Sequence, residues 1–269
     1  MSTIIGNAVI VGGGDIKISQ VLDENSWGVI KLVSSLGAGA NYWAVGDCKQ
    51  ITMNGKVSDG LTLTNYTAWV FIIGFNHNAE REGNGIAFQG FKTAQTGGTD
   101  ICLTDSGYKR GKTSGTWFNM NNSQTNAGGW SSSHMRSAVM PLIKAAFPAD
   151  LQAVIKTSTI YTDNTGGSSG NVVPTATQDD VFLLAEYEMF GASKYATTQE
   201  ANYLKQYAYY AAGNSKLKYK HNATGTAADW WGRSPYFTSS DRFCFVSSDG
   251  GAVCYYAYYS YGVAPAFKI

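Results

Sequence analysis

Apolar residues recur with helical spacing directly after Asn25 and Ser26. Positions 27, 29, 30, 32, 33 and 36 are apolar, Asn25 or Ser26 can cap the first turn, and Gly37 can end the helix. The pattern predicts a helix over 27–36, at the start of a compact domain. Before it, Ser2–Ile18 holds short β-branched runs broken by glycines, which favour strands or an extended arm.

The next segment reads as β-structure. From 43 to 75, short strand patterns alternate with the turn dipeptides Asn54-Gly55 and Asp59-Gly60. The stretch 69–75 is apolar at successive positions, which predicts a central strand buried on both faces. Polar residues follow over 76–85, where we expect a loop.

Helices and strands are both expected in the second half of the chain. The pattern predicts helices over 135–146 and 148–157, a polar loop over 162–177 and a tyrosine-rich helix over 199–211. The apolar run 182–190 is interpreted as a strand, and 248–251 as a hairpin turn between two strands, with a short strand at the end. The fold class expected is α+β.

Charge and composition narrow the function. The 269 residues include 20 Lys and Arg against 19 Asp and Glu, a net charge of +1, which argues against nucleic-acid binding. We expect no membrane insertion, because no apolar run approaches the length of a span, and no signal peptide. The four scattered cysteines are expected to be reduced. With 31 Gly and 17 Tyr, the composition suits turn-rich structure that presents an aromatic surface.

Motifs for catalysis and metal binding are weak. Gly107–Thr113 has one residue too few between its glycines for a phosphate-binding loop. The three histidines lack metal-site spacing, so we expect surface or capping roles for them, with no metal and no cofactor. Glu186 and Glu188, two apart on the expected strand, would face the same side, and a solvated pair is the commoner explanation. The sequence therefore does not indicate an enzyme.

The strongest positive signal is a tyrosine cluster near the C-terminal end, at positions 255, 256, 258, 259 and 261. Strand alternation sends neighbouring residues to opposite faces, so some of these rings must face outward. Exposed tyrosine interleaved with serine and glycine is typical of binding loops, because it gives rigid contact area at low entropic cost. The alternative is an ordinary aromatic sheet packed beneath another element.

Short segments along the chain resemble one family. They are Trp43-Ala-Val-Gly-Asp47, Phe71-Ile-Ile-Gly-Phe-Asn-His-Asn78, Gly128-Gly-Trp130 with Met135-Arg136, Phe182-Leu-Leu-Ala-Glu186, Ala212-Gly-Asn-Ser215, Trp231-Gly-Arg-Ser-Pro235 and Gly262-Val-Ala-Pro-Ala-Phe267. In this order they resemble the DUF6273-type proteins of gut bacteria and their prophages, over 27–269. The resemblance implies a C-type-lectin-like domain over 25–269, shared with formylglycine-generating enzymes, after a β-rich arm over 1–24.

The resemblance extends to the variable proteins of diversity-generating retroelements, in which error-prone copying at adenines rewrites the 3′ end of a gene. It implies a variable region over about 230–269 and a ligand-binding set within it. That set is Tyr236, Phe237, Ser239, Arg242, Phe245, Ser247, Val253, Cys254, Tyr255, Tyr256, Tyr258, Tyr259 and Tyr261. The scaffold implied around it is Trp230, Trp231, Arg233, Ser234, Gly250, Ala257, Gly262, Val263 and Phe267.

The function expected from this resemblance is binding of a host cell-surface protein or glycan by a protein of a phage tail or bacterial surface. A homo-oligomer is compatible with it. The calcium-binding triplets of sugar-binding lectins are absent from the sequence. Two alternatives stay open: a copper oxidase of the formylglycine-generating kind that uses Cys244 and Cys254, and a purely structural tail protein.

Overall fold

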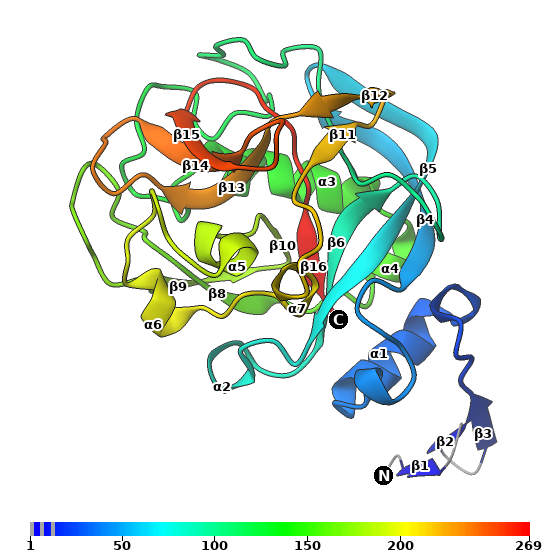
Figure 1. Cartoon of the computed structure of the whole chain (residues 1–269). Coiled ribbons are helices and arrows are strands. Elements are labelled where there is room, and N and C mark those ends of the chain that lie inside the picture. The colour runs from blue at the N-terminus through cyan, green and yellow to red at the C-terminus, as the bar shows by residue number, and fades with distance from the viewer. Residues whose placement is uncertain (1–2, 6–7, 12–13) are drawn as a thin grey trace.

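A five-stranded antiparallel sheet forms the centre of the molecule. The computed structural model describes residues 3–5, 8–11 and 14–269. In the sheet the order is β10-β16-β6-β5-β4, formed by Val181–Phe182, Ala266–Lys268, Ile86–Lys92, Leu61–Phe75 and Cys48–Ser58. Figure 1 shows β16 crossing the middle of the fold between β6 and β10. The sheet therefore joins the last described strand to the first half of the chain.

The β4–β5 hairpin confirms two sequence predictions and corrects one. The turn at Asp59-Gly60 is present, and 69–75 forms the buried end of β5 between β4 and β6. Asn54-Gly55 does not form a turn: it lies inside β4, where the pairing with β5 shifts register and Gly55 has φ +124°. Such a bulge accommodates an Asn-Gly pair within a strand, because glycine adopts the left-handed backbone freely.

Helix α1, Trp27–Ser35, forms as predicted. The Ser26 side chain caps it by accepting a hydrogen bond from the Val29 amide. Trp27 packs edge-on against Phe88 of β6 and Phe267 of β16, with ring centroids 5.6 and 6.4 Å apart. The helix is thereby fixed against the central sheet.

Of the other predicted helices, the first forms over its full length and the remaining two are shorter than expected. The 135–146 helix is present as a π-helical turn, Met135–Val139, followed by α3, Met140–Ala146. Within the predicted 148–157 helix, only α4, Ala149–Gln152, forms. The 199–211 segment holds two short helices, α6 (Glu200–Tyr203) and α7 (Ala208–Ala211), and the expected loop at 76–85 contains α2 (Ala79–Glu82). The polar loop lies between β8, Ser158–Thr162, and β9, Thr175–Asp179.

The interpretation of 182–190 as a strand is wrong beyond its first residue. Strand β10 ends at Phe182 and helix α5, Glu186–Phe190, begins four residues later. A short apolar run fits a buried strand and a buried helix equally well, so periodicity alone could not separate them. Glu186 and Glu188 are consequently buried helical residues and not a solvated pair on a strand.

A second, three-stranded sheet carries the C-terminal cluster. It consists of β13 (Trp230–Pro235), β14 (Arg242–Val246) and β15 (Ala252–Tyr256), in that order, with the predicted turn between β14 and β15. A small sheet of β12 (Ala223–Ala228), β11 (Lys218–Lys220) and β7 (Ile101–Cys102) lies beside β5 in the upper part of Figure 1. The whole is an α+β fold made mostly of sheets.

The N-terminal strands form a sheet of their own. It contains β1 (Thr3–Ile5), β2 (Ala8–Val11) and β3 (Gly14–Lys17), and lies at the periphery of Figure 1, on the same side of the view as α1. Ile18 and Leu22, which follow β3, are buried in the core, and the arm boundary at residue 24 stays a prediction. No helix in the described part of the chain has the length and apolar character needed to cross a membrane.

Candidate binding face

The edge strand β15 and the turn after it bring four tyrosines together. We call Tyr255, Tyr256, Tyr258 and Tyr259 the tyrosine face; all four are half-buried. Their rings form a continuous series: the centroids of Tyr255 and Tyr256 are 5.2 Å apart, those of Tyr255 and Tyr259 4.9 Å, and those of Tyr258 and Tyr259 4.9 Å. Mutual edge-to-face packing holds the rings while leaving part of each accessible.

Buried aromatic residues support this face from below. Tyr261 is 5% exposed and stacks on Phe245 at 5.1 Å, and its ring lies 5.0 Å from Trp231. Trp231 is fully buried and donates its indole hydrogen to the Phe118 carbonyl at 2.9 Å. The rings of the face therefore rest on a rigid aromatic base.

A loop from the middle of the chain closes the face on one side. The Asp105 carboxylate organises it, accepting hydrogen bonds from the Phe118 amide at 2.8 Å and from the Ser260 hydroxyl at 2.7 Å. The Lys112 amide donates to the Tyr258 carbonyl at 2.7 Å. At Gly111 a Cβ would lie 2.5 Å from the Tyr258 ring, so glycine leaves the space that this ring occupies.

Cationic residues occur on β14 and in the loop that closes the face. Arg242 lies over the Tyr256 ring at 4.8 Å, and Lys109 is ion-paired with Asp229 at 2.9 Å. Lys112 covers the Trp117 ring at 3.4 Å. Arg110, whose backbone carbonyl accepts from the Ser260 amide, is exposed. Of these cations, Arg242 contacts a ring of the tyrosine face, and the charge of Lys109 is balanced by Asp229.

The structure separates the thirteen expected binding residues into two groups. Ten are half-buried on the molecular surface: Tyr236, Phe237, Ser239, Arg242, Ser247, Val253, Tyr255, Tyr256, Tyr258 and Tyr259. Phe245, Cys254 and Tyr261 are buried, with exposed fractions of 6, 8 and 5%. The Phe245 and Tyr261 rings pack against each other and against Trp231 beneath the tyrosine face.

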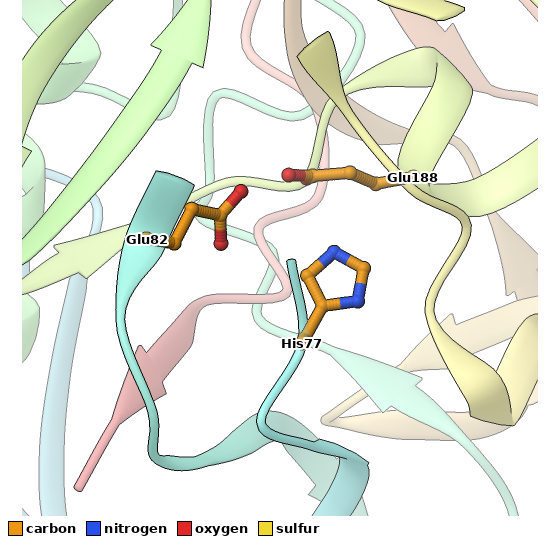
Figure 2. A group of neighbouring side chains, drawn as sticks. All are labelled: His77, Glu82 and Glu188. Atoms are coloured by element: carbon orange, nitrogen blue, oxygen red, sulfur yellow. The ribbon is translucent and has the colours of Figure 1, made fainter. Parts of the chain in front are cut away.

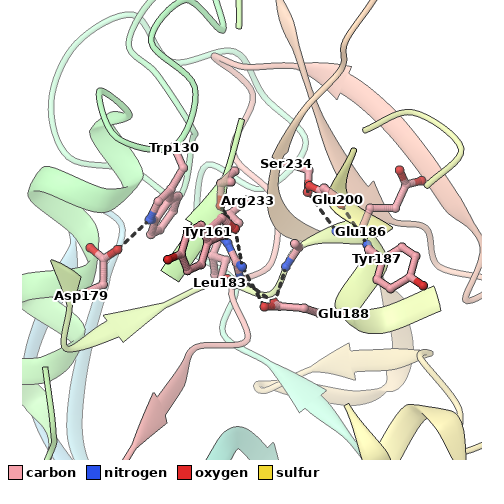
Figure 3. A network of polar contacts seen from close by, with 12 residues as sticks. Trp130, Tyr161, Asp179, Leu183, Glu186, Tyr187, Glu188, Glu200, Arg233 and Ser234 are labelled. Carbon is pink, nitrogen blue, oxygen red and sulfur yellow. Dashed lines mark hydrogen bonds and ion pairs between the residues drawn. The ribbon is translucent and has the colours of Figure 1, made fainter. Parts of the chain in front are cut away.

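The scaffold residue Arg233 lies in a buried polar cluster (Figure 3). Its guanidinium forms a two-pronged ion pair with Glu188, at 2.6 and 2.8 Å. Its other donors reach the Leu183 and Tyr161 carbonyls and the Thr162 hydroxyl at 2.6–3.0 Å. All five N–H donors of the guanidinium are thus used.

Glu188 of this pair also lies next to His77 and Glu82 (Figure 2), with ligand-type atoms of the three side chains all within 4.8 Å of one another. The carboxylates already have cationic partners, Lys268 for Glu82 and Arg233 for Glu188. The His77 ring stacks on Tyr207 at 3.7 Å, and burial lowers its pKa to about 4. Because Lys268 and Arg233 neutralise the two carboxylate charges, we interpret the carboxylates as members of a closed network of ion pairs. The expected surface or capping role for this histidine is wrong.

Two further buried carboxyls lie around α5. Glu200 accepts hydrogen bonds from the Ser234 hydroxyl at 2.6 Å and the Tyr187 amide at 3.2 Å, and burial raises its pKa to about 7. Glu186 accepts from three amides, the shortest that of Ala196 at 2.7 Å, and burial raises its pKa as well. They hold the chain around α5 against β13.

The sequence interpretation missed Asp105 and the His77 group. Asp105 follows a buried strand and precedes a glycine-rich loop, which is a recognisable turn signal. The His77 group has no such signal, because Glu188 of α5 is far in sequence from His77 and from Glu82 of α2. Only the fold brings them together.

Comparison with known proteins now adds one finding. The sequence profile of DUF6273, described as a domain of unknown function, matches residues 108–269. The chain belongs to the DUF6273 family. The matched region contains the tyrosine face and Arg233, but neither Asp105 nor the β4–β5 hairpin. No curated protein and no solved structure matches the chain.

Proposed function

We propose that this DUF6273 protein binds a ligand through the tyrosine face. The observation that carries the proposal is the continuous series of half-buried rings on the β15 edge, supported by the fully buried Trp231. Partly exposed tyrosines on a rigid base give large contact area at low entropic cost. They are also among the side chains that contribute most to binding free energy.

The proposed partner is a host cell-surface protein or glycan. Stacked tyrosines offer flat faces to apolar patches and sugar rings and hydroxyls for hydrogen bonding. The location proposed is a phage tail or bacterial surface. A C-type-lectin-like fold with retroelement-driven variation over residues 230–269 belongs to the same proposal. Its support is that ten of the expected variable residues are half-buried on the surface, where substitutions cost little stability.

The direct test uses fluorescently labelled protein on intact gut bacteria and on an array of bacterial surface glycans. The double variant Tyr256→Ser/Tyr258→Ser should lower affinity at least about 100-fold, since hot-spot truncation costs about 2 kcal/mol or more per residue. The matched control is Tyr203→Ser, a half-buried tyrosine of α6 outside the face. Equal binding by the double variant and wild type would refute the assignment of the site.

Retroelement variation has its own test. DNA downstream of the coding sequence should contain a near-copy of the segment for residues 230–269, differing at adenines, and a reverse-transcriptase gene. Absence of both would remove the variation from the proposal and leave a face with one fixed ligand. Light scattering of wild-type protein tests the structural alternative, in which the tyrosines bury themselves in an oligomer.

A further inference from the structure

Cys244 and Cys254 are direct cross-strand partners in the β14–β15 hairpin. Hydrogen bonds at both ends of the hairpin define the type of this pair: the Ser247 amide donates to Gly251, and the Ala257 amide donates to Asp241. Hydrogen-bonded and non-hydrogen-bonded pairs alternate along an antiparallel ladder. The pair at 244 and 254 is therefore non-hydrogen-bonded.

Such pairs bring the two backbones closest together. Their Cα atoms are about 4.5 Å apart, and a disulfide needs Cα separations of about 4.4–6.8 Å. Directly opposed side chains also lie on the same face of the sheet, with Cβ atoms within about 1 Å of disulfide spacing. The two cysteines can therefore be joined without moving either strand to a new register.

From this placement we infer that Cys244 and Cys254 form a reversible redox pair, oxidised to a disulfide by a low-molecular-weight disulfide such as oxidised glutathione. Both are free thiols in the structure. The inference is independent of the tyrosine face's ligand, and its test measures the bond itself.

The exposure and the charged neighbours of the two thiols determine which of them reacts first. Cys254 is 8% exposed and Cys244 1%, so the external disulfide reaches Cys254 first. Burial raises the pKa of both thiols, but Arg242 acts against this at Cys254, whereas Glu186 adds to it at Cys244. Cys254 is the attacking thiol, since the thiolate is the nucleophile.

The oxidation consists of two successive thiol–disulfide exchanges. The Cys254 thiol loses a proton and attacks one sulfur of oxidised glutathione, which releases one glutathione thiolate and leaves a mixed disulfide. The Cys244 thiol then loses its proton and attacks the Cys254 sulfur, which releases the second glutathione. Two electrons pass to glutathione, and one S–S bond joins β14 to β15.

The test incubates the folded full chain with oxidised glutathione, quenches with acid and alkylates the remaining thiols. Chymotrypsin cleaves after Phe245 and Tyr255 and separates the two cysteines, so a disulfide appears as one linked peptide in the mass spectrum. We expect this link, with Cys48 and Cys102 recovered in alkylated form, because Cys48 lies opposite Phe71 and Cys102 opposite Lys220, so neither faces another cysteine. A link that forms only in urea, or pairs Cys244 with another cysteine, overturns the inference.

Variants test the order. In Cys244→Ser the reaction should stop at a glutathione adduct on Cys254, whereas in Cys254→Ser the Cys244 thiol should stay unmodified. Cys102→Ser, which removes a buried cysteine of β7, is the matched control and should form the link like wild type. An adduct on Cys244 in Cys254→Ser would contradict the assigned order, and the wild-type measurement stands even where a variant folds poorly.

Discussion

The tyrosine face and the Arg233 cluster draw on the same three-stranded sheet but are held in opposite ways. Around Arg233 every donor of a buried cation has an acceptor, and Glu188 is paired on both oxygens. The tyrosines of the face mainly contact one another and keep part of their surface in solvent. The cluster needs specific partners, whereas the face needs only a supporting base. We therefore expect substitutions in the Arg233 cluster to lower the free energy of unfolding strongly, and substitutions on the tyrosine face to change it little.

Removing Arg233 gives the sharpest contrast. Arg233→Met should lower the free energy of unfolding by about 3–5 kcal/mol, because it leaves the Glu188 charge buried without its cation. Urea denaturation followed by circular dichroism measures this. Arg242→Met, at a half-exposed arginine of the neighbouring strand, is the control and should cost less than about 1 kcal/mol. Similar losses in both variants would break the comparison.

A second contrast lies within the expected binding residues. Phe245→Ala should cost about 3–5 kcal/mol, because it empties the space between Trp231 and Tyr261. Tyr258→Ala should cost far less, since its ring lies at the surface over Gly111. Thermal unfolding of both variants distinguishes supporting residues from contact residues. A low cost for Phe245→Ala would place that ring with the contact residues.

The buried acid beside the cluster predicts a pH dependence. Burial raises the pKa of Glu200 to about 7 from its usual 4.5, so between these values the folded protein keeps a proton that the unfolded chain has lost. Its contribution therefore makes the free energy of unfolding fall as pH rises through this window, by at most about 3 kcal/mol. Glu200→Gln should remove this slope in urea titrations at pH 5 to 8. Parallel wild-type and variant curves would contradict the shift.

His77 should act with the opposite sign. Burial lowers its pKa to about 4 from 6.5, so below 6.5 the unfolded chain takes up a proton that the folded protein refuses. The free energy of unfolding should fall as pH drops from 6.5 to 4, again by at most about 3 kcal/mol. His77→Phe, which can keep the stacking on Tyr207, should flatten this limb. If the free energy of unfolding of the variant falls between pH 6.5 and 4 as in wild type, groups other than His77 cause that fall.

The smallest stability effect is expected on the tyrosine face itself. Tyr256→Ser/Tyr258→Ser should shift the free energy of unfolding by less than about 1 kcal/mol, because both rings are half-buried at the surface. The unfolding measurement uses the same protein as the binding assay. A large loss of stability would show that the face is part of the core.

Local signals in the sequence were sufficient for the elements that depend on local chemistry. Helix α1 has a cap at Ser26 and a glycine after it, and the β14–β15 turn has Asp249-Gly250. Local signals were insufficient where pairing between strands determines the backbone conformation. Asn54-Gly55 is an example, because it pairs with β5 as a bulge inside β4 and does not form a turn. The same holds for 182–190, where the Glu188 carboxylate of α5 pairs with Arg233, which is distant in sequence.

The candidate site follows the same division. Alternation along β15 predicted that some tyrosines face outward, and four of them do so in part. It could not predict that Tyr261 turns inward onto Phe245, because that depends on Trp231 beneath both. Nor could it place Lys268 against Glu82, since their contact spans 186 residues.

The central sheet is complete only after strand β16 has been synthesised. Residues 266–268 fill the gap between β10 and β6, so until they leave the ribosome both neighbours have unpaired backbone edges. A premature stop or frameshift anywhere before residue 266 removes this strand and with it the closure of the central sheet. The closure of the sheet therefore depends on translation through the segment that encodes the tyrosine face, which precedes β16.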